Sequence, residues 1–322
     1  MPIDEQNHLT LVADIGGTNI RFGVAKKMLD KIEISNNRSF ACSDFDSFEA
    51  ALATYLDGLD CKPPVACLAV AGPVQSNAIQ MTNLPWAFSA SGLEKKFGFD
   101  QVDLINDFAA QACAVPAMGD QDLLQIKNGQ MVPGAAKGVL GPGTGLGVAT
   151  LVSQGGNWHP LSGEGGHVTL PVRTPYESEL MKVIIENYRL DYVSAETILC
   201  GQGLVTLYKA MATLQGKTSL DYRPRDITSR FNEDALVFDT LTVFTELLAN
   251  TASNLAVTVG ARGGVYLAGG ILPRIRNFLI NSPFTNSFIS KGPMSHYLEK
   301  IPVNLLINDN PALLGAAVWV RK

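Results

Sequence analysis

The sequence predicts an α/β protein with about two domains. Its 322 residues exceed the roughly 150 residues of one average domain by about a factor of two. Short apolar runs of strand character alternate with segments of helical spacing over the first hundred or so residues, which is typical of an α/β domain. With 46% hydrophobic and 17% charged residues, the composition is that of an ordinary folded protein and excludes global disorder.

The N-terminal part reads as strands and helices in alternation. Residues 9–14 and 20–25 are two apolar runs joined by the glycine-containing turn IGGTN, so the chain is predicted to open with a β-hairpin. The elements expected next are a strand near 32–40, a helix over 45–56, a strand over 65–70, a helix over 91–97 and a strand over 102–105.

A helix over 107–115 is predicted to lead into a second domain, which begins with strands at 138–140 and 148–152. The long apolar-periodic segment 235–259 contains polar residues that favour a packed helix over a membrane span. The last elements expected are a strand over 265–268, a helix from near Pro273, a strand over 303–307 and a helix over 311–320.

Charge and cysteine usage exclude several classes of function. The 25 Lys and Arg against 30 Asp and Glu give a net charge of −5, which disfavours binding to nucleic acid. The longest stretch without a charge, residues 63–93, is cut by Pro73 and Pro85 and is not expected to span a membrane. An odd number of cysteines without a C-x-x-C pair or signal peptide predicts free thiols in a reducing compartment, and hence a cytoplasmic protein.

Three segments that follow strands are rich in glycine: residues 14–19 (DIGGTN), 141–147 (GPGTGLG) and 267–271 (LAGGI). Glycine lets backbone N–H groups approach a phosphate with no Cβ in the way. One such segment is more simply a tight turn, but three together indicate a phosphate ligand. Asp14 and Thr18 in the first segment suit a hydrated Mg²⁺ beside phosphates. The dinucleotide fingerprint and the Walker A loop are both absent, because Leu146 and Met211 stand where each needs glycine.

A second group of residues is polar: Asn106, Asp107, Glu164, His167 and Glu196. A carboxylate accepts hydrogen bonds from two hydroxyls, so this set is suited to a polyhydroxyl ligand. Each residue alone has a structural explanation, as a helix cap, a surface acid, a packed histidine or a first-turn acid.

Two local motifs do not account for this group. A capping box at Ser194 is not expected, because Thr197 replaces the glutamate that the motif needs, so that motif leaves Glu196 unexplained. A closed zinc site at Glu164 and His167 is not expected either, because no second histidine or cysteine lies at ligand spacing.

The order of these motifs resembles the bacterial glucokinase family, within the superfamily of sugar kinases, actin and chaperone ATPases. The resemblance covers nearly the whole chain, and GEGGH is its most specific piece. The matching pieces are DIGGTN at 14–19, TNLPWAFS at 82–89, INDFAA at 105–110, GPGTGLGVA at 141–149, GEGGHV at 163–168, VSAE at 193–196, LAGGI at 267–271 and DNPALLGAA at 309–317.

The resemblance implies two α/β domains of the actin-like ATPase (ribonuclease H-like) type with an interdomain cleft that closes on the sugar. The smaller domain would comprise residues 1–110 plus 309–322, and the larger one residues 111–308. A homodimer is implied by the family and by nothing else in the sequence.

The family's reaction is transfer of the γ-phosphoryl group of ATP to the 6-hydroxyl of D-glucose. The resemblance implies a sugar site with Asp107 as the general base, formed by Asn83, Asn106, Asp107, Glu164, His167 and Glu196. It implies a nucleotide site formed by Asp14, Gly16, Gly17, Thr18, Asn19, Gly141, Gly143, Thr144, Gly145, Gly269 and Gly270. Asp14 would contact the Mg²⁺ of the nucleotide through water.

Other functions stay open at this stage. A kinase for mannose, fructose or an N-acetylated amino sugar would have the same loops and a different pocket. A sugar-sensing regulator would need a helix-turn-helix, and about eight residues before the first strand are too few for one. Sugar kinases and regulators of the ROK type usually carry a cysteine-rich zinc motif shortly after the G-E-x-G-H segment. Residues 168–177 of this chain contain no cysteine, which disfavours that type. An actin-like assembling ATPase has no need of GEGGH.

Overall fold

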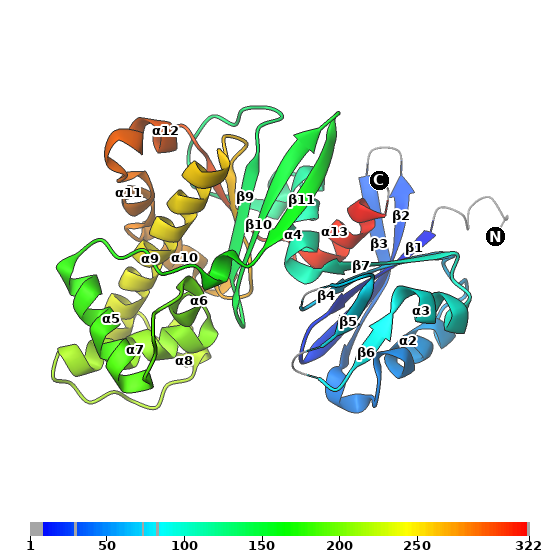
Figure 1. Ribbon diagram of the computed structural model, residues 1–322, viewed down its shortest axis with the longest axis horizontal. Coiled ribbons are helices and arrows are strands. Elements are labelled where there is room, and N and C mark those ends of the chain that lie inside the picture. Colours follow the sequence, from blue (N-terminus) through cyan, green and yellow to red (C-terminus); the bar gives the residue numbers. More distant parts are fainter. Residues whose placement is uncertain (1–8, 29–30, 73, 82–83, 321–322) are drawn as a thin grey trace. The chain divides into compact units, whose positions relative to one another are not determined.

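The computed structural model describes residues 9–28, 31–72, 74–81 and 84–320, and the chain divides into two compact units (Figure 1). Unit 1 comprises the chain up to Gly119 together with residues 157–162 and 308–322, and unit 2 comprises residues 120–156 and 163–307. Each unit combines a β-sheet with helices, so the predicted α/β class is confirmed at this level.

The sheet of unit 1 has the strand order β3-β2-β1-β4-β7. Its strands are β1 (Leu9–Ile15), β2 (Asn19–Met28), β3 (Lys31–Ala41), β4 (Val65–Val70) and β7 (Gln101–Asn106). The predicted opening hairpin is confirmed, because β1 and β2 are antiparallel. Strands β1, β4 and β7 are parallel, and Ile15 aligns with Val70, which aligns with Asn106. The ends of β1 and β7 therefore meet at the same edge of the sheet.

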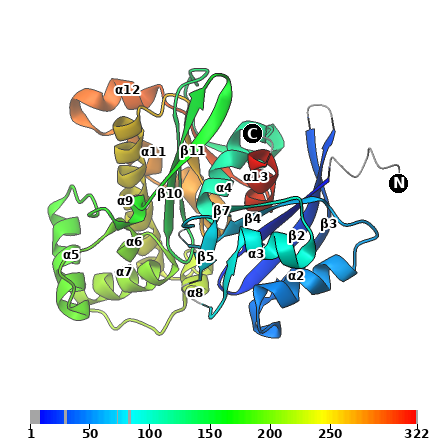
Figure 2. The same ribbon diagram turned by 45° about the vertical axis from the view of Figure 1, so that its right-hand side comes forward.

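Helices cover both faces of this sheet. Alternation along β1 explains why: Leu11, Ala13 and Ile15 pack into one apolar cluster, and Val12 packs into the other. The first cluster includes α2 (Phe48–Asp57) and α3 (Ala90–Phe97). The second includes α4 (Asp107–Ala114) and α13 (Pro311–Trp319), which lie side by side in Figures 1 and 2. The two helices approach closely because Gly315 has no side chain. A Cβ at that position would overlap the carbonyl of Ala110.

The six-stranded sheet has the order β11-β10-β9-β12-β13-β8, and all of its strands except β11 lie in unit 2. Its strands are β8 (Leu123–Lys127), β9 (Lys137–Pro142), β10 (Leu146–Gln154), β11 (Asn157–Gly163), β12 (Val265–Leu267) and β13 (Val303–Leu306). The prediction that the second domain begins with the strand at 138–140 is wrong, because β8 precedes it and pairs with β13. Strand β12 is parallel to β9, with Leu267 opposite Leu140, so both strands end at one edge.

Helices α5 to α12 pack with this sheet around one large apolar core. They are α5 (Pro175–Tyr188), α6 (Ala195–Ile198), α7 (Gly201–Leu214), α8 (Pro224–Ser229), α9 (Ala235–Val259), α10 (Arg276–Asn281), α11 (Phe284–Ile289) and α12 (Ser295–Glu299). The predicted helix over 235–259 is confirmed as α9, capped by Asp234 and ended by Gly260 in the left-handed conformation. In the part of the chain that the structure describes, no helix is long and apolar enough to cross a membrane.

Candidate active site

The first glycine segment forms the turn between β1 and β2. Gly16 N–H donates to the carbonyl of Asn19 at 3.0 Å, which closes the turn. Cys42 supports it from the following segment, because its N–H donates to Thr18 O at 2.8 Å and its thiol contacts Gly16 O at 3.4 Å. Thr18 and Asn19 remain exposed. The turn thus has a fixed backbone and accessible polar groups, and the sequence had indicated no role for Cys42 beyond that of a free thiol.

Asp14 stands one residue before the end of β1, directly across the hairpin from Arg21. The register pairs the two residues, and their side chains form an ion pair at 3.2 Å. Burial raises the pKa of Asp14, while the charge of Arg21 and their hydrogen bond act to lower it. Among the described residues, no group of three or more histidine, cysteine or acidic side chains could hold a metal ion. This single carboxylate fits a Mg²⁺ that is held mainly by nucleotide phosphates and contacted through water.

Asn106 ends β7 and caps α4. Its Oδ1 accepts from the N–H groups of Phe108 and Ala109, both at 3.0 Å, and its Nδ2 donates to Gly72 O at 3.2 Å. The helix-cap explanation for the Asn106–Asp107 pair therefore applies to Asn106. The amide holds the junction between strand and helix in one conformation.

Asp107, the first residue of α4, is only partly buried. Its Oδ1 accepts from Phe108 N–H at 2.8 Å. Burial and then the negative charge of Asp14 raise the pKa of Asp107 to about 6, against the lowering effect of that hydrogen bond. A carboxylate with this pKa is close to the range in which a general base works best at neutral pH.

The second and third glycine segments lie together in unit 2. GPGTGLG forms the turn from β9 to β10, and LAGGI follows β12 at the same edge of the sheet. Gly269 has a φ of 83°, and a Cβ there would overlap the carbonyl of Pro142. Within the turn, Gly143 N–H donates to Gly145 O at 2.8 Å, and Thr144 is exposed. Both segments present backbone to the same region, as a phosphate site requires.

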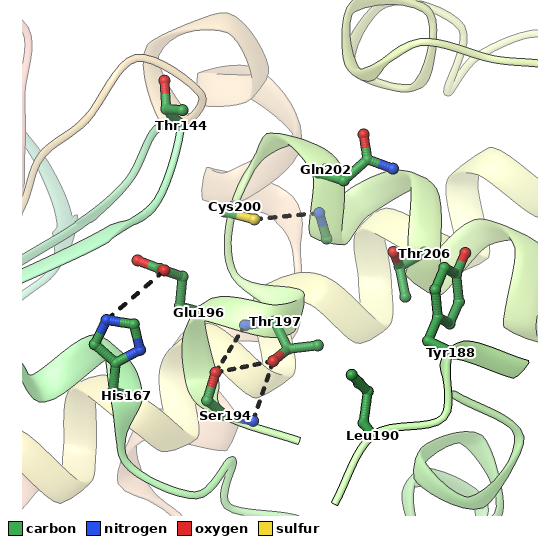
Figure 3. A pocket seen from close by; sticks show the side chains of 11 residues that line it. Thr144, His167, Tyr188, Leu190, Ser194, Glu196, Thr197, Cys200, Gln202 and Thr206 are labelled. Carbon is green, nitrogen blue, oxygen red and sulfur yellow. Dashed lines mark hydrogen bonds and ion pairs between the residues drawn. The ribbon is translucent and has the colours of Figure 1, made fainter. Parts of the chain in front are cut away.

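Three of the predicted sugar ligands also come together in unit 2. His167 Nε2 lies 3.9 Å from Glu164 Oε2 and 3.9 Å from Glu196 Oε1. Glu164 precedes the short 3₁₀ helix Gly165–His167, and its side chain is 80% exposed, whereas that of Glu196 is 34% exposed. Figure 3 shows His167 and Glu196 pointing toward each other. Two carboxylates around one imidazole give an acceptor-rich cluster suited to hydroxyl groups.

Glu196 makes a second contact, with the glycine turn. Its Oε2 accepts from Leu146 N–H at 2.7 Å. The start of α7 also reaches the turn, because Gly201 N–H donates to Gly143 O at 2.9 Å. Neither contact was predicted from the sequence, which had placed Glu196 with the sugar ligands alone.

The expectation that Ser194 and Thr197 make no capping box is wrong. Ser194 Oγ accepts from Thr197 N–H at 3.1 Å, and Thr197 Oγ1 accepts from Ser194 N–H at 3.2 Å. The threonine hydroxyl reaches back as a glutamate would, because the two residues are only three apart at the start of α6. The box fixes the start of α6 and with it the position of Glu196.

A cavity of about 460 Å³ opens beside this cluster (Figure 3). Both the glycine turn, through Thr144, and the acceptor cluster, through His167 and Glu196, contribute to its wall. The other lining residues are Tyr188, Leu190, Ser194, Thr197, Cys200, Gln202, Gly203 and Thr206. The two predicted sites of unit 2 therefore face one space.

The chain matches the model of the family described as Glucokinase over residues 11–322. The chain belongs to the glucokinase family. It is 44% identical to a glucokinase of Saccharophagus degradans over 319 residues, which cover 96% of this chain and 97% of that protein. The resemblance to bacterial glucokinases seen in the motifs is confirmed.

Solved structures agree with this membership. A glucokinase from an Antarctic psychrotroph superposes with a TM-score of 0.89 at 39% identity, covering 98% of this chain and 99% of that one. A ROK family glucokinase from Streptomyces griseus, solved in complex with glucose and AMPPNP, shares the fold with a TM-score of 0.64 at 19% identity, covering 97% and 99%.

The predicted glucokinase site residues fall into one group in each unit. Unit 1 holds Asp14, Gly16, Gly17, Thr18, Asn19, Asn106 and Asp107. Unit 2 holds Gly141, Gly143, Thr144, Gly145, Glu164, His167, Glu196, Gly269 and Gly270. Asn83 lies outside the described residues. Sequence reasoning missed Arg21, Cys42 and Gly201, and of these only Arg21, seven residues after Asp14 in the predicted hairpin, had a detectable pattern.

Proposed function

We propose that this chain transfers the γ-phosphoryl group of ATP to the 6-hydroxyl of D-glucose, with Asp107 as the general base. Membership of the glucokinase family carries the reaction: the chain is an ATP-dependent glucose kinase. The observation that carries the role of Asp107 is its partly buried carboxylate at the start of α4, with a pKa raised to about 6.

Asp107 has the protonation behaviour that the role needs. With a pKa of about 6 it is mostly ionised at pH 7 and still basic enough to receive a proton as the bond to phosphorus forms. Asn106 caps α4 by accepting hydrogen bonds from two backbone N–H groups, so the helix does not need Asp107 as its cap. In this proposal the 6-hydroxyl proton moves to a carboxylate oxygen of Asp107.

The nucleotide is assigned to the glycine turns. Backbone N–H groups of residues 16–19, 141–145 and 269–270 would hold phosphate oxygens, with Thr18 and Thr144 adding hydroxyl donors. Mg²⁺, when bound with the nucleotide, neutralises charge on the phosphate oxygens. Asp14 would hold that ion through water, with Arg21 keeping the carboxylate in place.

The sugar is assigned to Asn106 and Asp107 and to the Glu164–His167–Glu196 cluster, as the family resemblance implies. Each carboxylate of the cluster can accept from two hydroxyls, so together the groups can distinguish the pattern of hydroxyls on a hexose. The Asn83 assignment rests on the family motif alone.

The proposal extends to the wider setting of the enzyme. It includes the actin-like ATPase type of fold, MgATP as the phosphoryl donor and a homodimer, which rest on the family resemblance, and a cytoplasmic site of action, which rests on the cysteine usage. Light scattering at micromolar concentration tests the dimer, because a monomeric mass there contradicts it.

A coupled assay tests the function directly. ADP release is measured with glucose, mannose, fructose and N-acetylglucosamine, each with and without Mg²⁺, and glucose 6-phosphate is detected by its specific dehydrogenase. We expect the highest kcat/KM for glucose and no turnover without Mg²⁺. If kcat/KM for another hexose were tenfold or more higher than for glucose, that hexose and not glucose would be the preferred substrate. ADP release without a 6-phosphate product would contradict the reaction.

A further inference from the structure

We infer that Glu196 is a positioning residue that links the sugar cluster to the phosphate-binding turn, so that nucleotide binding depends on its carboxylate and is strengthened by glucose. The inference rests on the proposed function and deepens it. It changes what is expected of Glu196, which the sequence had placed only among the sugar ligands.

The first step is the bond from Leu146 N–H to Glu196 Oε2 at 2.7 Å. Leu146 is the first residue of β10, and its register partner on β9 is Pro142. The carbonyl of Pro142 accepts from Ile271 N–H at 3.3 Å. The N–H group at the start of β10 is bound by a side chain from α6. A hydrogen bond to an ionised carboxylate is stronger than one between neutral groups.

The second step is that the same carboxylate packs directly on the turn. A Cβ at Gly145 would overlap the Glu196 carboxylate, so the absence of a side chain there makes room for it. The turn is held a second time by the bond from Gly201 N–H to Gly143 O, at the start of α7. Glu196 and Gly201 thus attach one short segment of chain to both sides of Thr144.

That segment is itself stiff. The Ser194–Thr197 capping box fixes the start of α6, and Cys200 Sγ accepts from Gly203 N–H at 3.2 Å to cap α7. A shift of Glu196 therefore cannot be absorbed by a loose backbone. It is transmitted to Leu146 and the glycine turn.

The third step concerns the other oxygen of Glu196. Oε1 faces His167 at 3.9 Å, within the cluster assigned to sugar hydroxyls, while Oε2 holds the turn. A hydroxyl that bonds Oε1 fixes the rotation of the whole carboxylate, and with it the acceptor of Leu146 N–H. Because the bound sugar has then already ordered the Glu196 carboxylate, nucleotide binding no longer bears that entropic cost. Each ligand therefore strengthens the binding of the other.

Glu164 provides a matched control. Like Glu196, it lies 3.9 Å from His167, but its side chain is 80% exposed. The next residue, Gly165, packs against Val148 and not against the glycine turn. Glu164→Gln and Glu196→Gln make the same chemical change on two sides of one histidine. Only the second reaches Leu146.

The test is calorimetric titration of wild type, Glu164→Gln and Glu196→Gln with a nonhydrolysable ATP analogue and Mg²⁺, with and without saturating glucose. We expect glucose to tighten analogue binding several-fold in wild type and in Glu164→Gln. In Glu196→Gln we expect analogue binding about tenfold weaker without glucose, as for loss of one charge-assisted hydrogen bond, and a coupling factor near one. A residue that only supported the fold would not change the coupling factor selectively.

Analogue affinity and coupling in Glu196→Gln equal to those of wild type would overturn the inference and leave Glu196 as a sugar ligand only. Where Glu196→Gln does not fold, Glu196→Asp, which keeps the charge but withdraws the carboxylate by one methylene, is titrated in the same way with the same criterion. Failure of the proposed function is separate, because wild type would then phosphorylate no glucose at all.

Discussion

Asp107 lies at the same edge of the five-stranded sheet as Asp14, and burial together with the negative charge of Asp14 raises the pKa of Asp107 to about 6. The parallel arrangement of β1, β4 and β7 creates this relationship, because it brings the ends of β1 and β7 to one edge. In the proposed function, Asp14 contacts the Mg²⁺ of the nucleotide through water and Asp107 receives the proton.

The first prediction concerns the pH dependence of catalysis. Because the base must be ionised, kcat/KM for glucose should fall about tenfold per pH unit well below pH 6 and level off above it. The measurement is a pH profile with MgATP held saturating. A profile that stays flat down to pH 4.5 would show that no group with the raised pKa of Asp107 is needed.

The second prediction concerns the pH dependence of stability. A carboxyl whose pKa is raised on folding, here from 3.8 to about 6, contributes stability that is full below the unfolded value and lost as pH rises through the folded value. Asp107→Asn removes that loss. The Tm of Asp107→Asn relative to wild type should therefore be higher at pH 8 than at pH 4.5. Equal differences at both pH values by scanning calorimetry would contradict the raised pKa.

The third prediction separates two glycines of the same turn. A Cβ at Gly143 meets nothing closer than Gly145 O at 3.9 Å, whereas one at Gly145 overlaps Glu196. Gly143→Val should fold, raise the KM for ATP by tenfold or more and leave glucose binding nearly unchanged, since its side chain blocks only phosphate. Gly145→Val should weaken both ligands. Kinetics and glucose titration check this, and a folded Gly143→Val with a normal KM for ATP would remove the turn from the phosphate site.

The fourth prediction concerns Cys42 and the DIGGTN turn. Cys42→Ala removes the thiol contact to Gly16 O but keeps the backbone bond to Thr18. Because a thiol is a weak donor, we expect a rise of about two- to fivefold in the KM for ATP with little change in glucose affinity. Cys61→Ala, at a partly exposed cysteine whose thiol contacts Lys62 O, is the control. Equal effects of the two substitutions would indicate that Cys42 has no special role.

Local patterns account for what the sequence predicted well. The hairpin of β1 and β2 follows from two apolar runs around a glycine turn, and α9 follows from a long apolar periodicity bounded by Asp234 and Gly260. The short strands β5 (Ala78–Gln80) and β6 (Ala87–Ser89) and the edge strand β8 were missed. They are short, and in β8 the pairing partner β13 lies far along the chain, so periodicity gives little signal.

The site shows the same limit. Glycine and acidic motifs identified the residues, but the contacts that organise them join distant parts of the chain. Leu146 and Glu196 are 50 residues apart, and Cys42 lies 26 residues from Gly16. No local spacing rule predicts such a pair, because it depends on how the strands and helices of each unit pack.

The turnover of Asp107→Asn tests the central claim most directly. Asparagine keeps the shape and one acceptor but cannot take a proton, so with glucose and MgATP saturating the account predicts turnover roughly 10²–10⁴ times slower than wild type. Glucose affinity, measured in parallel by calorimetry, should fall only modestly. Turnover within a few-fold of wild type in a variant that binds glucose would contradict the assignment of Asp107 as the base.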